Sequence, residues 1–388
     1  MHLLRKFSRK VALGISGGVD SAVSGLLLKQ KGFEVIGVFM RNWDQLEEQG
    51  YCKSNQDEED AKWVCTKLDI PFKSVNYIKD YWNSVFSELI QQYINGCTPN
   101  PDILCNKHIK FGKFYDYAQN VLDCDYIATG HYANCSIDFM KQSSPENRAV
   151  HLLKAKDQRK DQTFFLCNIS QNALSRTIFP LGNLTKRQVK KIAVESSLKR
   201  LADKKESVGI CFVGTRSFKS FISEYIPPSP GCFIDIESGK VVGKHNGRHN
   251  FTIGQRCNLQ GTEKPYYVVQ KLKDSQDMHV AMGRDHRALF SNYFETELAH
   301  WISDVPRQLV EPVSGVFECE FRFQHTHPLR KCTVMRTNSK LIVNSLDEVS
   351  SLAPGQYAVF YLGDRCLGGA VISDTGPSNY ILQSNKIE

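Results

Sequence analysis

The first 131 residues alternate between short apolar segments and longer segments with apolar residues three and four positions apart. The short segments have the length and composition of buried strands, and the longer ones have the periodicity of amphipathic helices. Strands and helices that alternate in this way form βαβ units, which build a parallel sheet with helices on both faces. The expected strands are 11–16, 34–40, 72–77 and 125–131, and the expected helices are 21–31, 60–68, 81–94 and 102–120.

The second half of the chain is β-rich. After the proline-rich stretch YIPPSPG, residues 225–231, short segments of alternating apolar and polar residues follow one another, which is typical of strands. From about Phe294 the pattern continues without convincing helices, and a closed barrel is expected there because closure removes exposed strand edges. We therefore expect an α/β domain over 1–210, a small β-rich domain over 211–293 and a β-barrel domain over 294–388.

Composition excludes several classes of protein. With 388 residues and 41% hydrophobic content, the chain is long enough for two or three domains with their own cores. No segment approaches the ~18 uninterrupted apolar residues of a membrane span, so no membrane partner is expected. The 13 cysteines are scattered and none forms a CxxC pair, which favours a reducing compartment over an extracellular disulfide scaffold.

The stretch GISGGVDSAV, residues 14–23, lies between the first expected strand and the first expected helix. A helix N-terminus offers unpaired N–H groups and a favourable dipole to an anion, and Gly17 and Gly18 allow the backbone to approach it. Ser16 and Ser21 add hydroxyl donors, and Asp20 either orients the loop or holds a Mg²⁺ ion. The Lys of a Walker A loop and the spacing of a Rossmann loop are both absent. A glycine-rich turn used only for close packing is the structural alternative.

Positive charge is concentrated in one part of the chain. Residues 141–205 contain 15 Lys and Arg but 5 Asp and Glu, whereas the whole chain has a net charge of +8. Within this segment, residues 185–200 have the pattern of an amphipathic helix with a basic outer face. Ordinary solvated helix faces are one explanation. An excess this local, together with the anion-binding loop, favours a nucleic acid partner.

The motif SGGVDS, residues 16–21, resembles the signature loop of the N-type ATP pyrophosphatases, the PP-loop superfamily. Members of that superfamily bind ATP, transfer AMP to an oxygen of the substrate and release pyrophosphate. Argininosuccinate synthetases, GMP synthetases, tRNA lysidine synthetases and tRNA thiolases share such a loop, so the motif alone leaves the chemistry open.

The stretch GCTPNPDILCNKHIKFG, residues 96–112, contains the first of two cysteines of interest. Its prolines keep residues 98–101 extended, and Pro101 suits the first turn of the following helix. Asp102 and Cys105 are three residues apart and are expected to share one face of that turn. The helix dipole favours the thiolate form of a cysteine at this place, although cysteines in such helices are also common in protein cores.

A second cysteine, Cys211, lies in DKKESVGICFVG, residues 203–214. The positive charges of Lys204 and Lys205 would stabilise its thiolate or persulfide if they lie close to it. Two activated cysteines suit a sulfur relay, in which one carries a terminal sulfur and the other reduces the persulfide to release it.

Together with GHYA, RKDQTFFL and NFTIGQR, beginning at residues 130, 159 and 250, these motifs resemble those of the tRNA-specific 2-thiouridylases, which make 2-thiouridine at the wobble position of tRNA. The resemblance covers essentially the whole chain. It implies a Rossmann-like first domain of the adenine nucleotide alpha hydrolase type, ATP with Mg²⁺ as cofactors, and tRNA and a sulfur-donor protein as partners. It implies neither a DNA partner nor a metal site of the protein's own. Some related thiolases hold an iron–sulfur cluster on cysteines, and only Cys97 is near enough in sequence to suggest a further ligand.

The resemblance also implies roles for individual residues in the reaction. Asp102 would be the acid or base for the target uridine, which Asn100 and Pro101 would also meet. Cys211 would carry the persulfide, and Cys105 would form a transient disulfide with it. The implied ATP contacts are Gly14, Ile15, Ser16, Gly17, Gly18, Val19, Asp20, Ser21, Met40 and Gly130.

Further implied contacts belong to the tRNA. For His131, a hydrogen-bonded structural role at the end of a strand is the alternative. The implied tRNA contacts are His131, Lys160, Asp161, Gln162, Arg322, Phe323 and Gln356.

Two other functions remain open from the sequence: another adenylating ligase or amidotransferase of the PP-loop superfamily, and a non-catalytic RNA-binding relative. The first ten residues, MHLLRKFSRK, contain four basic residues and no acidic one, as mitochondrial presequences do. Several segments, among them VFMRNWD and TIFPLGNLTK, look more like the mitochondrial branch of the family. We therefore expect a mitochondrial location, with the bacterial cytoplasm as the alternative.

Overall fold

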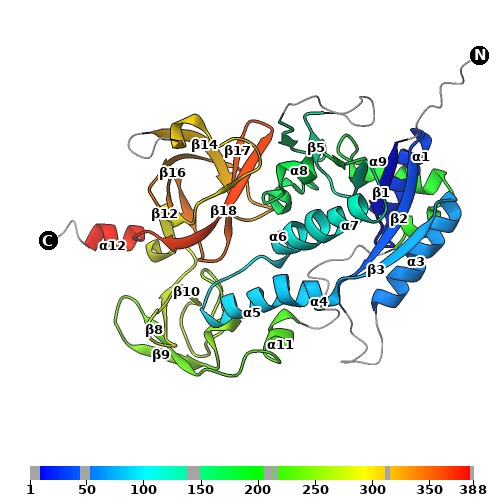
Figure 1. The fold of residues 1–388 in the computed structure, drawn as a ribbon. Coiled ribbons are helices and arrows are strands. Elements are labelled where there is room, and N and C mark those ends of the chain that lie inside the picture. The colour runs from blue at the N-terminus through cyan, green and yellow to red at the C-terminus, as the bar shows by residue number, and fades with distance from the viewer. Residues whose placement is uncertain are drawn as a thin grey trace, which may run out of the picture. The chain divides into compact units, whose positions relative to one another are not determined.

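The computed structural model describes residues 9–43, 53–137, 149–204, 213, 217–310 and 315–384 (Figure 1). The chain divides into two compact units. The first comprises Met1–Phe86, Pro101–Gly214 and Asp364–Leu367, and the second comprises Ser87–Asn100, Thr215–Gly363 and Gly368–Glu388.

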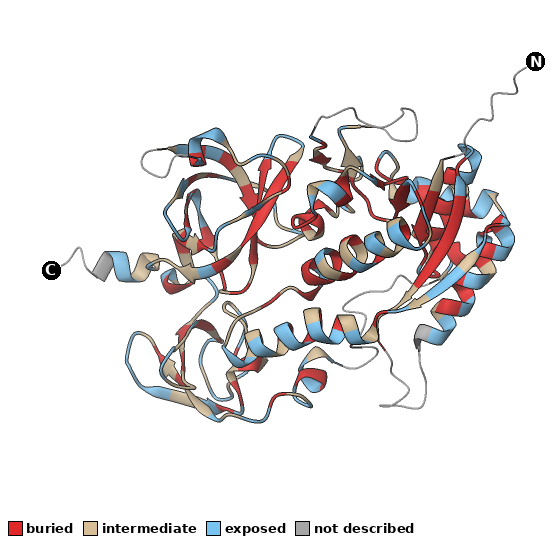
Figure 2. Cartoon of the chain, in the orientation of Figure 1, coloured by how far each residue is buried: buried red, intermediate tan, exposed pale blue. Residues whose placement is uncertain are grey.

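A five-stranded parallel sheet forms the centre of the first unit, in the order β3-β2-β1-β4-β7. The predicted parallel sheet is thus confirmed. β1 and β2 are buried (Figure 2), but β3 is largely exposed, contrary to the expectation of a buried strand, because it lies at the sheet edge. The two-residue β7 is too short for a sequence pattern to predict. The strands of this sheet are β1 Lys10–Gly14, β2 Glu34–Arg41, β3 Phe72–Asn76, β4 Tyr126–Ala128 and β7 Thr177–Ile178.

Helices cover this sheet: α1 contacts both α3 and α9, and α7 packs against β4. Two π-helical stretches, 82–86 and 106–113, interrupt the α-helical segments. The remaining elements of the first unit are short strands and 3-10 turns. The helices are α1 Val19–Gln30, α3 Lys53–Leu68, α4 Ile78–Tyr81, α6 Pro101–Cys105, α7 Phe114–Asn120, α8 Gln171–Leu174, α9 Lys186–Glu195 and α10 Lys199–Ala202, and the further strands are β5 Asn134–Cys135 and β6 Leu152–Leu153.

Two helix boundaries differ from the sequence prediction. α3 begins at Lys53 rather than at residue 60. The prediction missed its first two turns because they are polar and carry no apolar periodicity. The helix expected over 185–200 is two helices, since Ser196 has an extended backbone with ψ of −178° that ends α9. Gly32 and Gly96 follow helix ends, and their φ values of +79° and +80° favour glycine.

Two β structures make up most of the second unit. A four-stranded sheet in the order β10-β11-β8-β9 encloses a core that includes Phe233, Val268 and Met278. Six strands, in the order β12-β16-β15-β14-β17-β18, close into the predicted barrel because β12 also pairs with β18. Only Arg365 and Cys366 of β18, which belong to the first unit, pair with β6. The strands are β8 Gly231–Asp235, β9 Val241–His245, β10 Tyr266–Lys271, β11 Met278–Met282, β12 Phe290–Thr296, β13 His300–Trp301, β14 Val316–Arg322, β15 Arg330–Arg336, β16 Leu341–Ser350, β17 Tyr357–Leu362 and β18 Arg365–Thr375.

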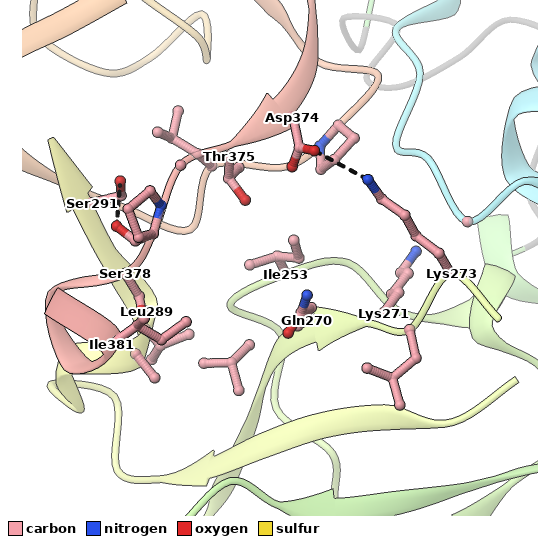
Figure 3. A pocket seen from close by; sticks show the side chains of 18 of the residues that line it. Ile253, Gln270, Lys271, Lys273, Leu289, Ser291, Asp374, Thr375, Ser378 and Ile381 are labelled. Carbon is pink, nitrogen blue, oxygen red and sulfur yellow. Dashed lines mark hydrogen bonds and ion pairs between the residues drawn. The ribbon is translucent and has the colours of Figure 1, made fainter. Parts of the chain in front are cut away.

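The second unit also contains the helices α5 Ser87–Ile94, α11 Phe218–Ile222 and α12 Asn379–Ser384. The last of these lies in a section where the sequence pattern predicts no helix. A cavity lies within this unit (Figure 3). Across the described ranges, no helix is long and apolar enough to cross a membrane.

A reciprocal pair of hydrogen bonds fixes the start of α9. The Gln188 backbone N–H donates to Thr185 Oγ1 at 3.3 Å, and the Thr185 N–H donates to Gln188 Oε1 at 2.8 Å. We predict that Thr185→Ala lowers the free energy of unfolding by about 1 kcal/mol, whereas Thr185→Ser, which keeps the hydroxyl, has a smaller effect. Urea denaturation of the three proteins measures this difference, and equal losses in both variants would contradict a capping role.

Candidate functional site

The loop of residues 14–21 joins the end of β1 to the start of α1. Ile15 N–H donates to Val38 O at 2.9 Å, so the loop leaves the sheet directly beside β2. Gly18 is the residue before the helix, and no side chain caps the helix there. The Ser16 backbone N–H donates to Ser21 Oγ at 3.2 Å, and the two hydroxyl oxygens lie 3.3 Å apart. The loop therefore presents a helix N-terminus and two hydroxyl groups in one place.

Two glycines allow other backbone segments to approach this loop. Gly17 has a φ of +72°, and a Cβ there would collide with the Asp57 carbonyl oxygen and lie 3.0 Å from Asp60 Cβ. A Cβ on Gly130 would lie 2.8 Å from the Ser21 backbone nitrogen. The structure thus brings Gly130, which follows β4, against the loop at the carboxyl ends of the strands, where ligands of open α/β sheets bind. Met40 also lies close, since a Cβ on Gly14 would be 3.1 Å from its Cε.

Asp20 is held by two side chains that are distant in sequence. The Tyr132 hydroxyl donates to Asp20 Oδ1 at 2.9 Å, and Lys186 Nζ donates to both carboxylate oxygens at 2.8 and 2.7 Å. Gln162 in turn fixes Tyr132, because each accepts a backbone N–H bond from the other, at 3.0 and 2.9 Å. These bonds fix the Asp20 carboxylate at the loop, as its predicted role in orienting the loop requires.

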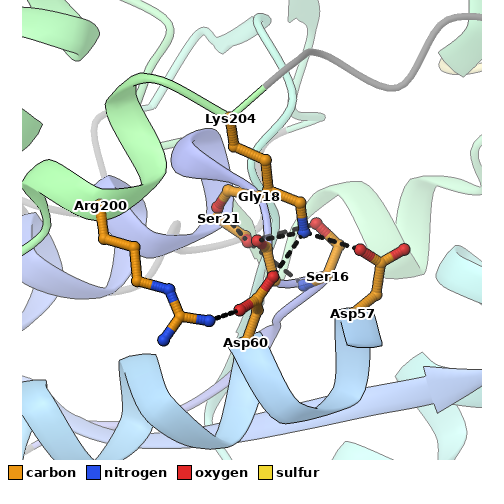
Figure 4. Close-up of polar contacts among 8 residues, drawn as sticks. Ser16, Gly18, Ser21, Asp57, Asp60, Arg200 and Lys204 are labelled. Carbon is orange, nitrogen blue, oxygen red and sulfur yellow. Dashed lines mark hydrogen bonds and ion pairs between the residues drawn. The ribbon is translucent and has the colours of Figure 1, made fainter. Parts of the chain in front are cut away.

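A second group of charges surrounds Lys204 beside the loop (Figure 4). Lys204 Nζ donates to Asp57 Oδ1 at 2.8 Å and to Asp60 Oδ2 at 2.7 Å, and it lies 3.4 Å from the Gly17 carbonyl oxygen. Arg200 also pairs with Asp60, which is buried. Burial disfavours the charged amine, but the hydrogen bonds to Asp57 and Asp60 outweigh it and raise the pKa of Lys204. Lys204 is therefore a fixed cation beside the loop.

The arrangement fits a polyphosphate. An uncapped helix N-terminus, the space left by two glycines and two neighbouring lysines together suit a multiply charged anion. No group of three or more His, Cys, Asp or Glu that could hold a metal ion occurs in the described ranges. Mg²⁺ is commonly held by one or two carboxylates and the phosphates of its substrate, and Asp20 and Asp57 are carboxylates in a position to contribute.

The sequence pattern did not identify most of these supporting residues. Asp57 and Asp60 belong to the acidic run DEED, three residues apart on α3, and this spacing is the only signal that could have identified them. Tyr132, Lys186 and Arg200 come from separate segments, and nothing in their local sequence points to the loop.

Around the first candidate cysteine, two residues that lie three positions apart on one helix differ in burial. Asp102 is exposed, whereas Cys105, three residues later in α6, is buried. Pro101 begins α6 and is buried, and Asn100 belongs to the second unit. Cys211, the predicted persulfide carrier, and Lys205 lie outside the described residues.

Most predicted tRNA contacts of the first unit have structural partners. His131 is buried, its Nδ1 lies 2.8 Å from Thr129 Oγ1, and burial together with Lys110 lowers its pKa well below the usual value. Asp161 is also buried and accepts hydrogen bonds from the Ala155 backbone N–H at 3.0 Å and from the Thr163 hydroxyl at 2.7 Å. Lys160 is half-buried. The hydrogen bonds of His131 and Asp161 fix the backbone segments that carry them.

The predicted contacts in the second unit belong to the barrel. Arg322 is buried and donates to the Tyr361 hydroxyl from Nε at 3.2 Å and from Nη2 at 2.9 Å. Phe323 is buried next to it, and Gln356 Oε1 accepts the Ala353 backbone N–H at 3.2 Å. These contacts order two ends of the barrel strands.

Comparison with known proteins gives matches along the whole chain. Residues 9–215 match the tRNA methyl transferase HUP domain, residues 219–282 the tRNA methyl transferase PRC-barrel domain, and residues 291–372 the aminomethyltransferase beta-barrel domain. The mitochondrial tRNA-specific 2-thiouridylase 1 of Homo sapiens is 48% identical over 97% of this chain and 93% of that protein. The Drosophila melanogaster protein of the same name is 47% identical, covering 95% of both chains. The tRNA-specific 2-thiouridylase of Mycoplasma capricolum is 44% identical, covering 94% of this chain and 98% of that one.

We predict that Gly17→Ala lowers the free energy of unfolding by more than the strain of a positive φ alone would. Gly32→Ala is the matched control, because Gly32 has a similar φ of +79° but a Cβ there would meet no atom of the described residues within 4 Å. The control should lose about 1 kcal/mol of unfolding free energy. Gly17→Ala should lose more, because its methyl group would also displace the Asp57 backbone. Denaturation curves measure both losses, and equal values would show that the close approach is unimportant.

Proposed function

The chain belongs to the tRNA-specific 2-thiouridylase family, and we propose that its 14–21 loop binds ATP to adenylate the C2 oxygen of the wobble uridine. The chain is accordingly a tRNA sulfurtransferase that forms 2-thiouridine. The observation that supports the ATP site most directly is the uncapped start of α1 at Gly18, with Gly17 and Gly130 leaving room for phosphate. Family membership argues against the other ligases and amidotransferases that share the loop motif.

Adenylation solves a chemical problem of the substrate. The C2 carbonyl of uridine is a poor electrophile, and its oxygen is a poor leaving group. When this oxygen attacks the α-phosphorus of ATP, pyrophosphate leaves and the oxygen becomes part of an AMP leaving group. Lys186 and Lys204 lie beside the loop and can exchange their carboxylate partners for phosphate oxygens, which stabilises the departing charge. Mg²⁺ bound with ATP supplies further charge neutralisation, and Asp20 and Asp57 would hold it.

Sulfur transfer then uses the two cysteines. The terminal sulfur of a Cys211 persulfide attacks C2 and displaces AMP, which leaves the base joined to Cys211 through two sulfurs. The Cys105 thiolate attacks the sulfur of Cys211, breaks this S–S bond and releases 2-thiouridine. The resulting Cys105–Cys211 disulfide takes up two electrons from an external thiol before the next cycle. A donor protein that carries a persulfide recharges Cys211.

Asp102, which is exposed at the start of α6, is the proposed acid or base for the uridine, with Asn100 and Pro101 beside it. Lys160 is proposed to contact tRNA directly. The other proposed tRNA residues act mainly through the surface segments that they fix, since most of their side chains are buried or hydrogen-bonded internally; these are His131, Asp161, Gln162, Arg322, Phe323 and Gln356.

We assign the protein to the mitochondrion. The eukaryotic relatives carry mitochondrial names, which supports this location. The bacterial relative supports the cytoplasm of a bacterium as the alternative.

The sulfur relay is tested by replacing each cysteine in the full chain. Cys105→Ser and Cys211→Ser should each abolish formation of 2-thiouridine, because the relay needs both sulfurs. Pyrophosphate release that depends on tRNA and ATP should persist, since adenylation precedes the relay. Nucleoside mass spectrometry and a pyrophosphate assay measure the two steps, with Cys135→Ser as the matched control outside the motifs. Full thiolation by both variants would rule out the relay.

The role of Lys186 is tested by comparing two lysine substitutions on α9. Lys186→Met removes the cation beside Asp20, and kcat/KM for ATP in tRNA-dependent pyrophosphate release should fall about tenfold or more, as loss of a charged hydrogen bond implies. Lys191→Met is the control, because Lys191 is exposed and pairs with Glu195 on the same helix. An equal effect of both changes would assign the loss to general surface charge instead.

A further inference from the structure

The second unit contains a cavity that thiolation, as proposed above, does not use. Its volume is about 560 Å³, and β10, residues 288–291 and residues 373–378 supply much of its lining (Figure 3). Every residue that lines it belongs to the second unit. The volume lies within the range of small-molecule sites, which are mostly apolar with a few polar groups.

One side of the cavity is apolar. Figure 3 shows Leu289 and Ile381 on the side opposite Lys271 and Lys273, with Ile253 between them. Further aliphatic side chains line the cavity among its polar groups, so a ligand that fills it needs an apolar body as well as a polar group. The aliphatic lining residues include Ile236, Ile253, Val269, Leu272, Leu289, Val349, Leu352 and Ile381.

The other side carries cationic groups. Arg248 donates from Nη1 to Leu272 O at 3.0 Å and from Nη2 to Ile94 O at 3.2 Å, so carbonyl groups hold it in place. Its Nε and the Nζ of Lys271 are buried, and neither has a hydrogen-bond partner within the described ranges. The acidic residue of the lining, Asp374, lies at the rim in an ion pair of 3.1 Å with Lys273. The cavity therefore has an excess of positive charge that no carboxylate of its described lining balances.

An unpaired lysine in such a place destabilises the folded protein. Burial, with a further contribution from Arg248, lowers the pKa of Lys271 to about 8, although Cys97 opposes the shift. A methionine would fill the same space without a charge to desolvate. A lysine that costs stability and lacks an internal partner among the described residues is explained if an external anion completes the site.

We propose that this cavity binds a small amphipathic anion, with its apolar body against Leu289 and Ile381 and its anionic group at Lys271. Carboxylates, phosphate esters and sulfonates share the required chemistry. The proposal is independent of the thiolation reaction, because it involves none of the residues assigned to that reaction. Its failure would therefore leave the proposed function untouched.

Equilibrium binding of 8-anilinonaphthalene-1-sulfonate to the full chain, followed by fluorescence, tests the proposal. The wild type should bind this anion more tightly than N-phenyl-1-naphthylamine, which has the same aromatic body without the charge. Lys271→Met should weaken binding of the anion about tenfold, the order expected for loss of one charged contact, and leave the neutral probe unchanged. Lys273→Met is the matched control, since Lys273 is an exposed rim residue paired with Asp374, and it should change little.

The pH dependence identifies the group responsible. A lysine whose pKa is about 8 is charged below that pH, so affinity for the anion should fall as pH rises through 8. The ionisable groups around Lys271 are Arg248, Cys97, His249 and the rim pair of Lys273 with Asp374. Burial raises the pKa of Cys97 and lowers that of His249, so neither titrates near pH 8. The decline should be present in Lys273→Met and absent in Lys271→Met.

Competition defines the ligand class. Hexanoate and phenyl phosphate should displace the fluorescent anion from the wild type, and whichever competes better indicates the preferred anionic group. Inorganic phosphate at the same concentration should not displace it, because it has no apolar body. Circular dichroism melting provides the folding control, and Lys271→Met should melt no lower than the wild type at pH 7. Equal affinities of the wild type and Lys271→Met for the anion, or displacement by inorganic phosphate alone, would overturn the proposal.

Discussion

The close approach of two backbone segments to the 14–21 loop is the constraint on which the candidate ATP site depends. Gly17 lets α3 come near at Asp57, and Gly130 lets the end of β4 touch Ser21. Side chains at either position would push these segments apart. Because the loop lies between them, the helix N-terminus, the two serine hydroxyls and Asp20 are fixed relative to the parallel sheet.

Pairing of buried charge distinguishes the two units. Beside the loop, two lysines have carboxylate partners: Lys186 with Asp20, and Lys204 with Asp57 and Asp60. These pairs keep the cations charged and in place beside the loop. In the cavity of the second unit, Lys271 has no such partner among the described residues. Carboxylates offset the cost of desolvating the lysines beside the loop, but no carboxylate of the described lining offsets it for Lys271. An external anion in the cavity would supply the missing charge.

Local patterns predicted the regular parts of the fold. The apolar runs of β1 and β2 and the alternation in the barrel strands are properties of short segments, so they can be recognised without knowledge of their neighbours. The patterns failed where the burial or the length of an element depends on its neighbours in the structure. β3 is exposed because it lies at the sheet edge, and α9 ends at Glu195 although its periodicity continues beyond that residue. The polar start of α3 carries no periodic signal, and its importance comes from where Asp57 and Asp60 lie in space.

The sequence by itself determined the candidate phosphate-binding loop, the family and the two candidate relay cysteines, because short contiguous motifs carry each of them. Only the tertiary structure decided what surrounds the loop. Lys186 lies 166 residues from Asp20, and Lys204 lies 147 residues from Asp57. Lysines and aspartates are common on any protein surface, so no local pattern singles these out. They become a site only because the parallel sheet aligns the ends of its strands and α9 packs against α1, which brings these distant charges within hydrogen-bond distance.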